Sequence, residues 1–354
     1  MSEDVWAARD TTPDDIDAAL RAMLRQRHAE DRTLAPARVL NLVVIVDREW
    51  KGEIANRLER VGRYHASRTI LCAVEEGRDT LDAVATLNYD GAVGGEIHPM
   101  HENVEVDFGV EQLSRIDTVV DPVLVAELPT VVWSPHGHDE AVETLLPRVD
   151  VILVDSDDKE ESVGLDRAAH LLESVYVVDL AWLRTTPWRE RLAASFDPAP
   201  RLAALDRLDQ VSVRHRPSSA ASAALLTGWL ASRLHWTIQP LAPQNGSGWT
   251  GTAARPGDDE QIDLRLVPFD QEAPGLAGVT VGWRPGCSLS LDRSPGGLLA
   301  HECSSSGSER SWRVLGASRG EGGILGEGVR QALLRDPTYG PALAAARTLC
   351  GGGC

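Results

Sequence analysis

The sequence predicts an α/β protein with a doubly wound, mostly parallel sheet, followed by a C-terminal α+β domain of antiparallel strands. Apolar, β-branched runs alternate with helical patterns through residues 39–196, which is typical of parallel strands covered by helices. Short alternating strands dominate residues 262–303, and the linker-like Asp-Pro-Ala-Pro at 197–200 separates the two patterns. We therefore expect an α/β domain at 1–200, an α+β domain at 201–340 and a flexible tail at 341–354.

A strand–helix–strand unit at residues 39–74 organises the first domain. Val39 to Val46 is a short apolar run that predicts a strand buried on both faces. Apolar residues at helical spacing follow, Gly62 ends the helix, and Thr69 to Val74 is a second buried strand. The two strands must be parallel, because a strand–helix–strand crossover of this length is right-handed and joins parallel strands.

A helix precedes this unit. Thr12-Pro13-Asp14-Asp15 supplies an N-cap, a first-turn proline and acids that favour the helix dipole, and the helix is expected to reach about His28. Three imperfectly alternating segments after Glu76 predict antiparallel edge strands, at 80–92, 96–97 and 103–107. The remaining elements of this domain are expected as helix 112–120, strand 128–133, helix 139–146, strand 149–155, helix 163–172, strand 175–179 and helix 180–196.

The second domain begins with a strand at 211–213 and an amphipathic helix at 219–234. Residues 239–259 are rich in Gly, Pro, Asn and Ser and are expected to form a surface loop. A closing helix covers 329–334, and the Ala-rich tail from Gly340 ends in Cys-Gly-Gly-Gly-Cys. Between them, antiparallel strands are expected at 262–267, 278–283, 288–292 and 298–303, with a hairpin turn at 294–297.

Composition limits the possible partners. The chain has 354 residues, and its 53 acidic residues exceed its 35 basic ones, which gives a net charge of -18. Such a chain should repel nucleic acid and anionic membranes. No apolar run approaches the ~20 residues of a membrane span, and the N-terminus lacks signal-peptide character, so we expect a cytoplasmic protein. Trp (10) outnumbers Phe (3) and Tyr (4), which favours a binding protein.

The usual catalytic and nucleotide motifs are missing from the sequence. It contains no GxxxxGK[ST] phosphate loop, no GxSxG nucleophile elbow and no HExxH zinc motif. The first βα turn, Asp47-Arg48-Glu49-Trp50, has none of the glycines that let a backbone approach a pyrophosphate. We therefore expect no catalytic residues and no cofactor.

Polar residues at the entry of the second buried strand are candidate anion ligands. His65, Ser67 and Arg68 could hold a phosphate, with help from Arg214, His215 and Arg216 farther along the chain. The structural alternative is that the first three satisfy backbone carbonyls and carboxylates at a strand entry. We weigh these two readings equally for the first group and favour the structural one for the second.

Three further groups of residues are candidate ligand or redox sites. The histidine pairs His98–His101 (with Glu102) and His136–His138 lie in loops where histidine is simply tolerated, so no metal site is expected. Asp155, Asp157 and Asp158 form an acidic strand end that reads as a solvated loop. Cys350 and Cys354 are separated by three glycines, which permit a tight disulfide ring, and are either a redox pair or idle thiols on a frayed end.

Four stretches, in order, resemble the OpcA family of glucose-6-phosphate dehydrogenase assembly proteins. They are RVLNLVVIVD with HASRTI, VVDPVLVAELPTVVW, VVDLAWLRTTPWRERLAASFD and LLTGWLASRLHW. The resemblance implies a non-enzymatic protein that binds glucose-6-phosphate dehydrogenase and promotes its active oligomer. The competing hypothesis is a sensor or enzyme for a small phosphorylated sugar, with His65 and Arg68 as anion ligands.

Tryptophan-bearing segments are the expected partner-binding residues. Trp133 ends one core strand, and Trp182 and Trp188 follow the strand that ends at Asp179. Because the ends of parallel strands lie along one edge of a sheet, these four residues are expected to contribute to the interface. The alternative is that the rings pack at the domain boundary, since Trp is largely buried on average.

Overall fold

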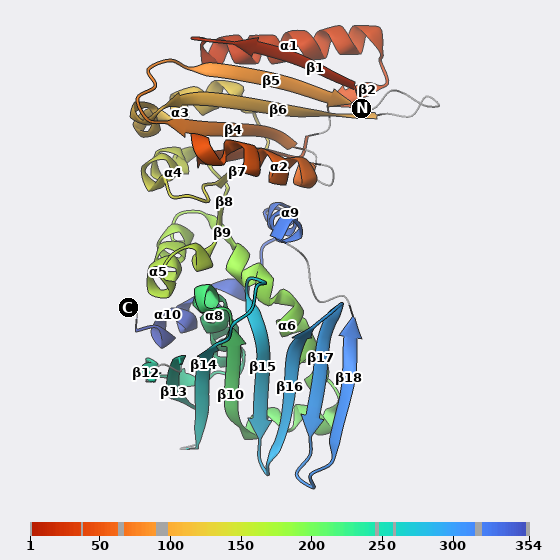
Figure 1. The fold of residues 1–354 in the computed structure, drawn as a ribbon, viewed down its shortest axis with the longest axis vertical. Helices are drawn as coiled ribbons and strands as arrows, with labels where there is room; N and C mark the ends of the chain where they lie inside the picture. Colours follow the sequence, from red (N-terminus) through yellow and green to blue (C-terminus); the bar gives the residue numbers. More distant parts are fainter. Residues whose placement is uncertain are drawn as a thin grey trace. The chain divides into compact units, whose positions relative to one another are not determined.

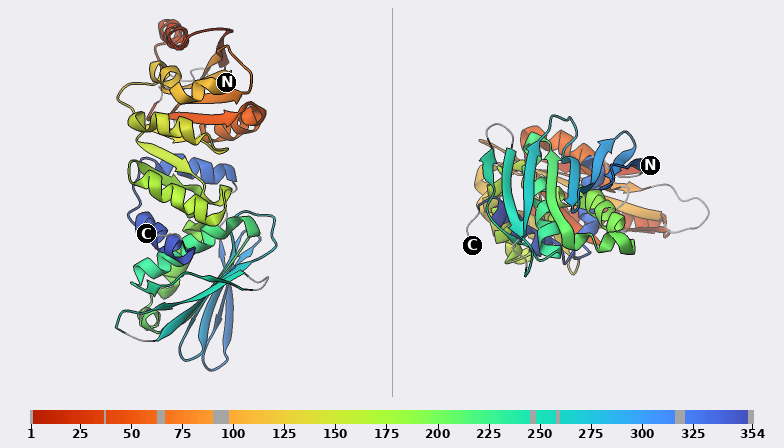
Figure 2. Two further views of the ribbon diagram at one scale, coloured as in Figure 1. Left: turned by 90° about the vertical axis from the view of Figure 1, so that its left-hand side faces the viewer. Right: turned by 90° about the horizontal axis from the view of Figure 1, so that it is seen from below.

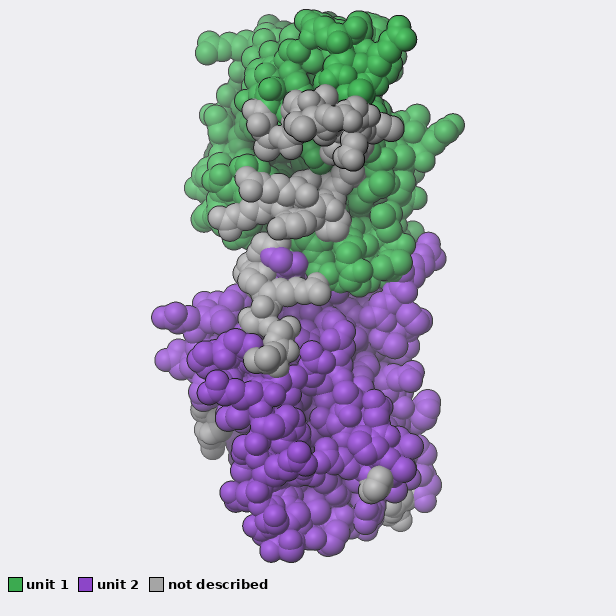
Figure 3. Space-filling view, turned by 90° about the vertical axis from the view of Figure 1, so that its right-hand side faces the viewer, with its two compact units in different colours: residues 1–154, 174–178, 325–334 green, residues 155–173, 179–324, 335–354 purple. Residues whose placement is uncertain are grey.

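The computed structural model describes residues 2–36, 38–62, 67–89, 98–244, 248–257, 260–315 and 321–351. The chain forms two compact units (Figure 3): unit 1 holds residues 1–154, 174–178 and 325–334, and unit 2 holds residues 155–173, 179–324 and 335–354. The predicted fold class is confirmed, because sheet A is largely parallel and sheet B is mostly antiparallel. The continuous domains expected from the sequence stay a prediction.

The elements of sheet A and their helices follow the chain in order (Figure 1). They are β1 (Ser2–Ala8), α1 (Pro13–Glu30), β2 (Leu34–Pro36), β3 (Leu40–Asp47), α2 (Lys51–Gly62), β4 (Ser67–Glu75), β5 (Asp82–Tyr89), β6 (His98–Gly109), α3 (Asp117–Val120), β7 (Thr130–Trp133), α4 (Asp139–Leu145), β8 (Val151–Val154), α5 (Glu161–Leu172) and β9 (Tyr176–Asp179).

The second half of the chain supplies sheet B and the remaining helices. They are α6 (Leu180–Phe196), α7 (Ala199–Leu202), β10 (Leu208–His215), α8 (Ala220–Arg233), β11 (Thr237–Ile238), β12 (Ala242–Gln244), β13 (Gly248–Ala254), β14 (Gln261–Pro268), β15 (Leu276–Trp283), β16 (Cys287–Ser294), β17 (Gly297–Cys303), β18 (Glu309–Leu315), α9 (Glu321–Gln331) and α10 (Tyr339–Leu349).

Sheet A has the strand order β1-β5-β6-β4-β3-β7-β8-β9 (Figure 1). The strand–helix–strand unit expected at 39–74 is confirmed: β3 and β4 are parallel neighbours, and α2 packs against both. Strands β6, β4, β3, β7 and β8 are all parallel, and their order reverses between β3 and β7. Counted along the chain, these strands and β9 have the order of a doubly wound dinucleotide-binding sheet.

The expected edge strands were only partly correct. β5 and β6 are antiparallel partners, but β6 also pairs in parallel with β4 and is therefore interior. The edge is β1, an N-terminal strand that the sequence analysis missed because its short acidic pattern resembles a disordered terminus. The helix expected at 112–120 is a 3-10 turn at Val110–Arg115 followed by the short α3.

Sheet B has the order β11-β13-β14-β10-β15-β16-β17-β18. Helices α6 and α8 pack against this sheet and α10 packs on α8, as the views in Figure 2 show. The surface loop expected at 239–259 was wrong in part, since β12 and β13 lie within it. The backbone of β13 passes close to Leu241 at Gly251, where a Cβ would lie 2.7 Å from the Leu241 side chain. No helix in the described ranges is long and apolar enough to cross a membrane.

The flexible tail expected from residue 341 was wrong for residues up to Leu349. These residues form α10, whose Ala342, Ala346 and Leu349 are completely buried. The physical reason is their small size, because α8 and α10 approach closely at Gly228. A Cβ on Gly228 would lie 2.4 Å from the Ala342 carbonyl oxygen. The alanine-rich sequence of α10 therefore provides the small side chains that allow this helix to pack closely on α8.

Substituting alanine for either of two helical glycines should have opposite effects on stability, because only Gly228 lies close to another helix. Gly228→Ala should destabilise the protein by about 1–3 kcal/mol, because the added methyl group forces α10 away. Gly52→Ala in α2 meets nothing within 4 Å and is the matched control. It should be neutral or stabilising by up to about 1 kcal/mol, since alanine favours helix more than glycine does. Urea unfolding measures both, and equal stability of the two variants would contradict the packing argument.

Candidate functional site

Doubly wound sheets bind ligands beyond the carboxyl ends of their strands, where the strand order reverses. In this chain that point lies after β3 and β7. His138 Nε2 lies 3.1 Å from Asp47 Oδ1 there, and the ring centroids of Trp50 and His136 are 5.1 Å apart. Partial burial lowers the pKa of His136, which favours its neutral form. Side chains therefore occupy the turn that glycines keep open in dinucleotide-binding proteins.

The cations beside this turn already face carboxylates. Lys51 begins α2, and its Nζ lies 2.9 Å from a Glu105 oxygen and 2.7 Å from Asp107 Oδ1, both on β6. Arg48 Nε lies 3.8 Å from the other Asp107 oxygen. A phosphate at the start of α2 would have to compete with these pairs, so the geometry does not favour nucleotide binding.

Arg68, one of the expected anion ligands, is bound within the protein. Its side chain is 4% exposed, and its Nε donates to Glu102 Oε2 at 2.5 Å. Its Nη1 donates to the Val123 carbonyl at 2.8 Å. Arg38 donates to the other oxygen of Glu102, which is completely buried. The charge of Arg68 is therefore balanced by a buried carboxylate, which favours the structural alternative.

The neighbouring expected ligands add little to an anion site. Ser67 is buried, and its Oγ lies 3.2 Å from Thr69 Oγ1. His65 lies outside the described residues, so its role stays a prediction. In the second group, Arg214 is paired with Asp292, and His215 Nδ1 lies 2.8 Å from the Arg216 carbonyl. These contacts favour the structural reading for that group as well.

The tryptophans proposed for partner binding are buried in the isolated chain. Trp133, Trp182 and Trp188 are 3%, 2% and 1% exposed. Trp133 belongs to unit 1, whereas the other two belong to unit 2. Trp182 donates from Nε1 to Asp336 Oδ2 at 2.9 Å, and Arg189 stacks on its ring at 3.5 Å. This burial favours the packing alternative, and a direct role in an interface stays a prediction.

Asp179, the fourth residue of that set, organises a buried polar cluster in unit 2. It caps α6 by accepting from the Ala181 N–H at 2.9 Å. It also accepts from Ser156 Oγ at 2.6 Å and from the Tyr339 hydroxyl at 3.0 Å. Burial, followed by the charge of Asp155, raises the pKa of Asp179 to about 6.

The acidic strand end after β8 belongs to the same cluster and is not the solvated loop expected from the sequence. Asp155 forms a two-point ion pair with Arg184, with distances of 2.7 and 2.6 Å. Asp157 accepts from the N–H of Ser222 at 3.0 Å and from its hydroxyl at 2.5 Å. Burial, followed by the charge of Asp155, raises the pKa of Asp157 to about 7. The signal missed in the sequence was that α8 begins with small residues able to pack over these carboxylates.

The two histidine pairs do not converge on a metal site in the structure. His138 is the left-handed residue before α4, and the His136 ring contacts Trp50 at a tilt of 35°. Glu102 binds the two arginines described above. Among the described residues, no group of three or more His, Cys, Asp or Glu side chains is arranged to hold a metal ion.

Of the cysteine pair, only Cys350 falls within the described residues. It caps the end of α10 and lines a small cavity of about 90 Å³ beside Trp249 and Leu349. Cys354 lies outside the described residues, so the redox hypothesis stays a prediction.

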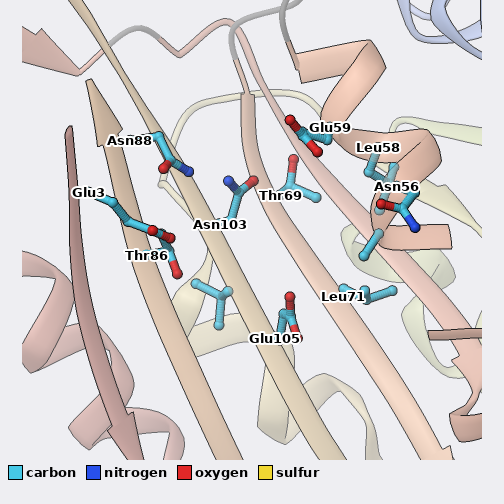
Figure 4. Close-up of a pocket in the computed structure, with 12 residues that line it drawn as sticks. Glu3, Asn56, Leu58, Glu59, Thr69, Leu71, Thr86, Asn88, Asn103 and Glu105 are labelled. Atoms are coloured by element: carbon cyan, nitrogen blue, oxygen red, sulfur yellow. The ribbon is translucent and has the colours of Figure 1, made fainter. Parts of the chain in front are cut away.

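A groove lined by both polar and apolar side chains lies on the face of sheet A between α2 and the edge strand β1 (Figure 4). Its volume is about 270 Å³. Strands β1, β5, β6 and β4 form its floor, and Asn56 and Glu59 of α2 form one wall. Sequence analysis did not identify this groove, because its polar residues come from α2 and four strands, of which β1 was not predicted and β4 was expected to be buried.

The Arg68–Glu102 pair gives a prediction that separates structural from ligand-binding roles. Glu102→Ala leaves the buried Arg68 and the partly exposed Arg38 without their carboxylate and should cost about 3–5 kcal/mol of stability. The double variant Arg68→Met/Glu102→Leu removes both charges and should recover most of that loss. Urea unfolding of both variants, beside Arg68→Met alone, checks this. A loss below about 1 kcal/mol for Glu102→Ala would show that the pair is not structural.

The carboxylate cluster predicts a pH-dependent stability difference. The pKa of Asp157 is higher in the folded protein, so ionising it costs stability as pH rises from its ordinary unfolded value near 4 towards 7. Asp157→Asn removes this cost, so its stability relative to wild type should increase by about 2 kcal/mol between pH 5 and pH 8. The exposed Asp206→Asn is the control and should show no such trend. If the stabilities of wild type and Asp157→Asn change equally with pH, the raised pKa of Asp157 is contradicted.

Comparison with known families matches both halves of the chain, in order. Residues 58–169 match the model for the glucose-6-phosphate dehydrogenase subunit N-terminal domain. Residues 175–343 match the model for the C-terminal domain of the same subunit. The first match ends within α5 and the second begins just before β9, and together they cover most of the chain.

Curated relatives agree with these matches. The putative OxPP cycle protein OpcA of Synechocystis sp. (strain ATCC 27184 / PCC 6803 / Kazusa) is 35% identical over 141 residues, covering 38% of this chain and 30% of the relative. The protein of the same name from Nostoc punctiforme is 34% identical over 176 residues, covering 48% and 36%. The matched part of the chain thus spans about a third of the length of these relatives.

Solved structures with a similar arrangement are oxidoreductases by title. An NAD binding oxidoreductase from Klebsiella pneumoniae has a TM-score of 0.48 at 8% identity, covering 89% of this chain and 96% of that one. An inositol dehydrogenase homolog complexed with NAD+ from Azotobacter vinelandii has a TM-score of 0.46 at 9% identity, covering 90% and 97%. The family matches, in contrast, cover both halves of the chain in sequence order, and the chain belongs to the OpcA family, whose models describe domains of a glucose-6-phosphate dehydrogenase subunit.

Proposed function

We propose that this protein binds glucose-6-phosphate dehydrogenase, promotes its active oligomer and raises its activity, without catalysing a reaction itself. The observation that carries the proposal is the ordered match of both halves of the chain to domains of a glucose-6-phosphate dehydrogenase subunit. The names of the curated relatives are consistent with it. The net charge of -18 supports a protein partner over nucleic acid or an anionic membrane.

The non-catalytic part of the proposal is supported by the switch point of sheet A. The βα turn there has no glycine, His138 Nε2 lies 3.1 Å from Asp47, and Lys51 pairs with two carboxylates. A sheet with a dinucleotide-binding strand order is therefore retained without the backbone that contacts a pyrophosphate.

The alternative, a sugar-phosphate sensor or enzyme using His65 and Arg68, has less support. Arg68 is buried against Glu102, and the cost of removing its charge from that carboxylate would oppose phosphate binding. We therefore keep the assembly role as the proposed function.

Steady-state kinetics test the proposal directly. Purified glucose-6-phosphate dehydrogenase should gain activity as this protein is added, reaching a plateau at a fixed molar ratio, and the two should elute together on size exclusion. The protein alone should show no turnover of glucose 6-phosphate with either nicotinamide cofactor. Its melting temperature should not change with glucose 6-phosphate, because ligand binding to the native state would raise it. Turnover by the protein alone, or separate elution without activation, would overturn the proposal.

A further inference from the structure

A second groove, of about 260 Å³, lies in unit 2 between the last turns of α6 and α8, and we call it the α6–α8 groove. Leu208 of β10 and Val281 of β15 form its floor, and each is 1% exposed. Leu202 of α7 lines the same groove but is 56% exposed. Among the described residues that line the groove, only Asp197 and Arg233 carry a charge. The groove is therefore a largely apolar surface that is in contact with water.

The α8 wall presents two residue types that are enriched in protein interfaces. Trp229 and Arg233 are four residues apart in α8, so they lie one turn apart on the same side of the helix. Arg233 is exposed and Trp229 is only partly buried, unlike Trp133, Trp182 and Trp188. Tryptophan and arginine are frequent among the residues that carry most of the binding energy at an interface. The α6–α8 groove thus places two such residues beside an apolar floor.

The two charges of the groove lie on opposite walls. Asp197 directly follows α6, and Arg233 is the last residue of α8. The structure describes both side chains, and no ion pair joins them across the groove. An occupant lying between the walls is therefore favoured when it carries a basic residue on the Asp197 side and an acidic residue on the Arg233 side.

The construction of the walls favours a helix as the occupant. Both walls are helices, so they offer side chains but no sheet edge to which an extended segment could add as a strand. A small apolar molecule could fill the space above the floor, but Leu202 at the rim would stay in water. An amphipathic helix with apolar residues at positions i, i+3, i+4 and i+7 covers the floor and the rim together.

We propose that the α6–α8 groove binds an amphipathic helix of the dehydrogenase, with a basic residue facing Asp197 and an acidic residue facing Arg233. The proposal rests on the function proposed above. The apolar stripe of that helix packs against Leu208 and Val281 and covers Leu202. All residues that line the groove belong to unit 2, so the site is complete within one unit.

Two exposed leucines test the apolar part of the proposal. Leu202→Ser should weaken binding of the dehydrogenase by about tenfold or more, because an apolar contact with the partner helix is lost. Leu333→Ser is the control, since Leu333 lies outside the groove, and its binding should stay within about twofold of wild type. The two side chains are 56% and 49% exposed, so neither substitution should unfold the protein. Thermal unfolding of both variants checks that they are folded.

An exchange of charges tests the orientation of the helix. Asp197→Lys/Arg233→Glu keeps the net charge at -18 but reverses the charges on the two walls, so it should weaken binding by about tenfold or more. Asp263→Lys/Arg265→Glu exchanges two exposed charges on β14 and should bind as wild type does. Hydrogen exchange of the wild-type complex should show added protection in α7 and in the last turns of α6 and α8.

The outcomes separate this proposal from the proposed function. If wild type binds and activates the dehydrogenase and both groove variants do so equally well, the groove proposal is wrong and the assembly function stands. If wild type alone elutes as a dimer that Leu202→Ser dissociates, a second copy covers the groove and the proposal is again wrong.

If wild type does not bind the dehydrogenase, the assembly function fails and a peptide tests the groove. The probe is an amphipathic helical peptide of about 18 residues, made of leucine, alanine, glutamate and lysine. Amide NMR shifts confined to α7 and the last turns of α6 and α8, lost in Leu202→Ser, would support a helix-binding groove. Shifts scattered over the surface, or none, would overturn it.

Discussion

The ion pair between Asp155 and Arg184 fixes the centre of unit 2, because it makes a group of buried carboxylates tolerable. Asp155 and Asp157 follow β8, and Asp179 ends β9, so the carboxyl ends of two strands bring three acids together. One guanidinium cannot satisfy three carboxylates. Further donors are the hydroxyl groups of Ser156, Ser222 and Tyr339, which come from the β8 end, α8 and α10. Backbone N–H groups, such as those of Ala181 and Ser222, donate as well. The helices of unit 2 are thus positioned by the hydrogen-bond demand of these acids.

The strand order of sheet A is that of dinucleotide-binding proteins, but this order does not itself require a bound nucleotide. Strand order is set by apolar burial and by right-handed crossovers, and neither requires a ligand. Binding a dinucleotide depends on a few backbone positions after the first strand. In this chain those positions carry Asp47, Arg48 and Trp50, and nearby cations pair with β6. The fold could therefore be retained for its packing while the site at its switch point was filled by side chains.

Much of sheet A could be predicted from the sequence, because its central strands are continuous apolar runs with a strong local signal. Elements that depend on partners distant in the chain could not. β1 is stable only when paired with β5, and α10 is a helix because Gly228 lets its alanines approach α8. The burial of Asp157 requires the start of α8, 65 residues away. Residue patterns describe a local preference, whereas these features are decided by tertiary contacts.

Abundant tryptophan was a reasonable indicator of binding, yet Trp133, Trp182 and Trp188 are buried in this chain. Tryptophan supplies the large apolar area that a chain with few Phe and Tyr residues needs for its cores. The groove on sheet A, in contrast, is lined by the amides of Asn88 and Asn103 and by three glutamates. Polar, charged surfaces contribute more to partner selection and association rate than to raw affinity. The abundance of tryptophan therefore did not locate a binding surface, because the side chain that is enriched in interfaces also fills buried cores.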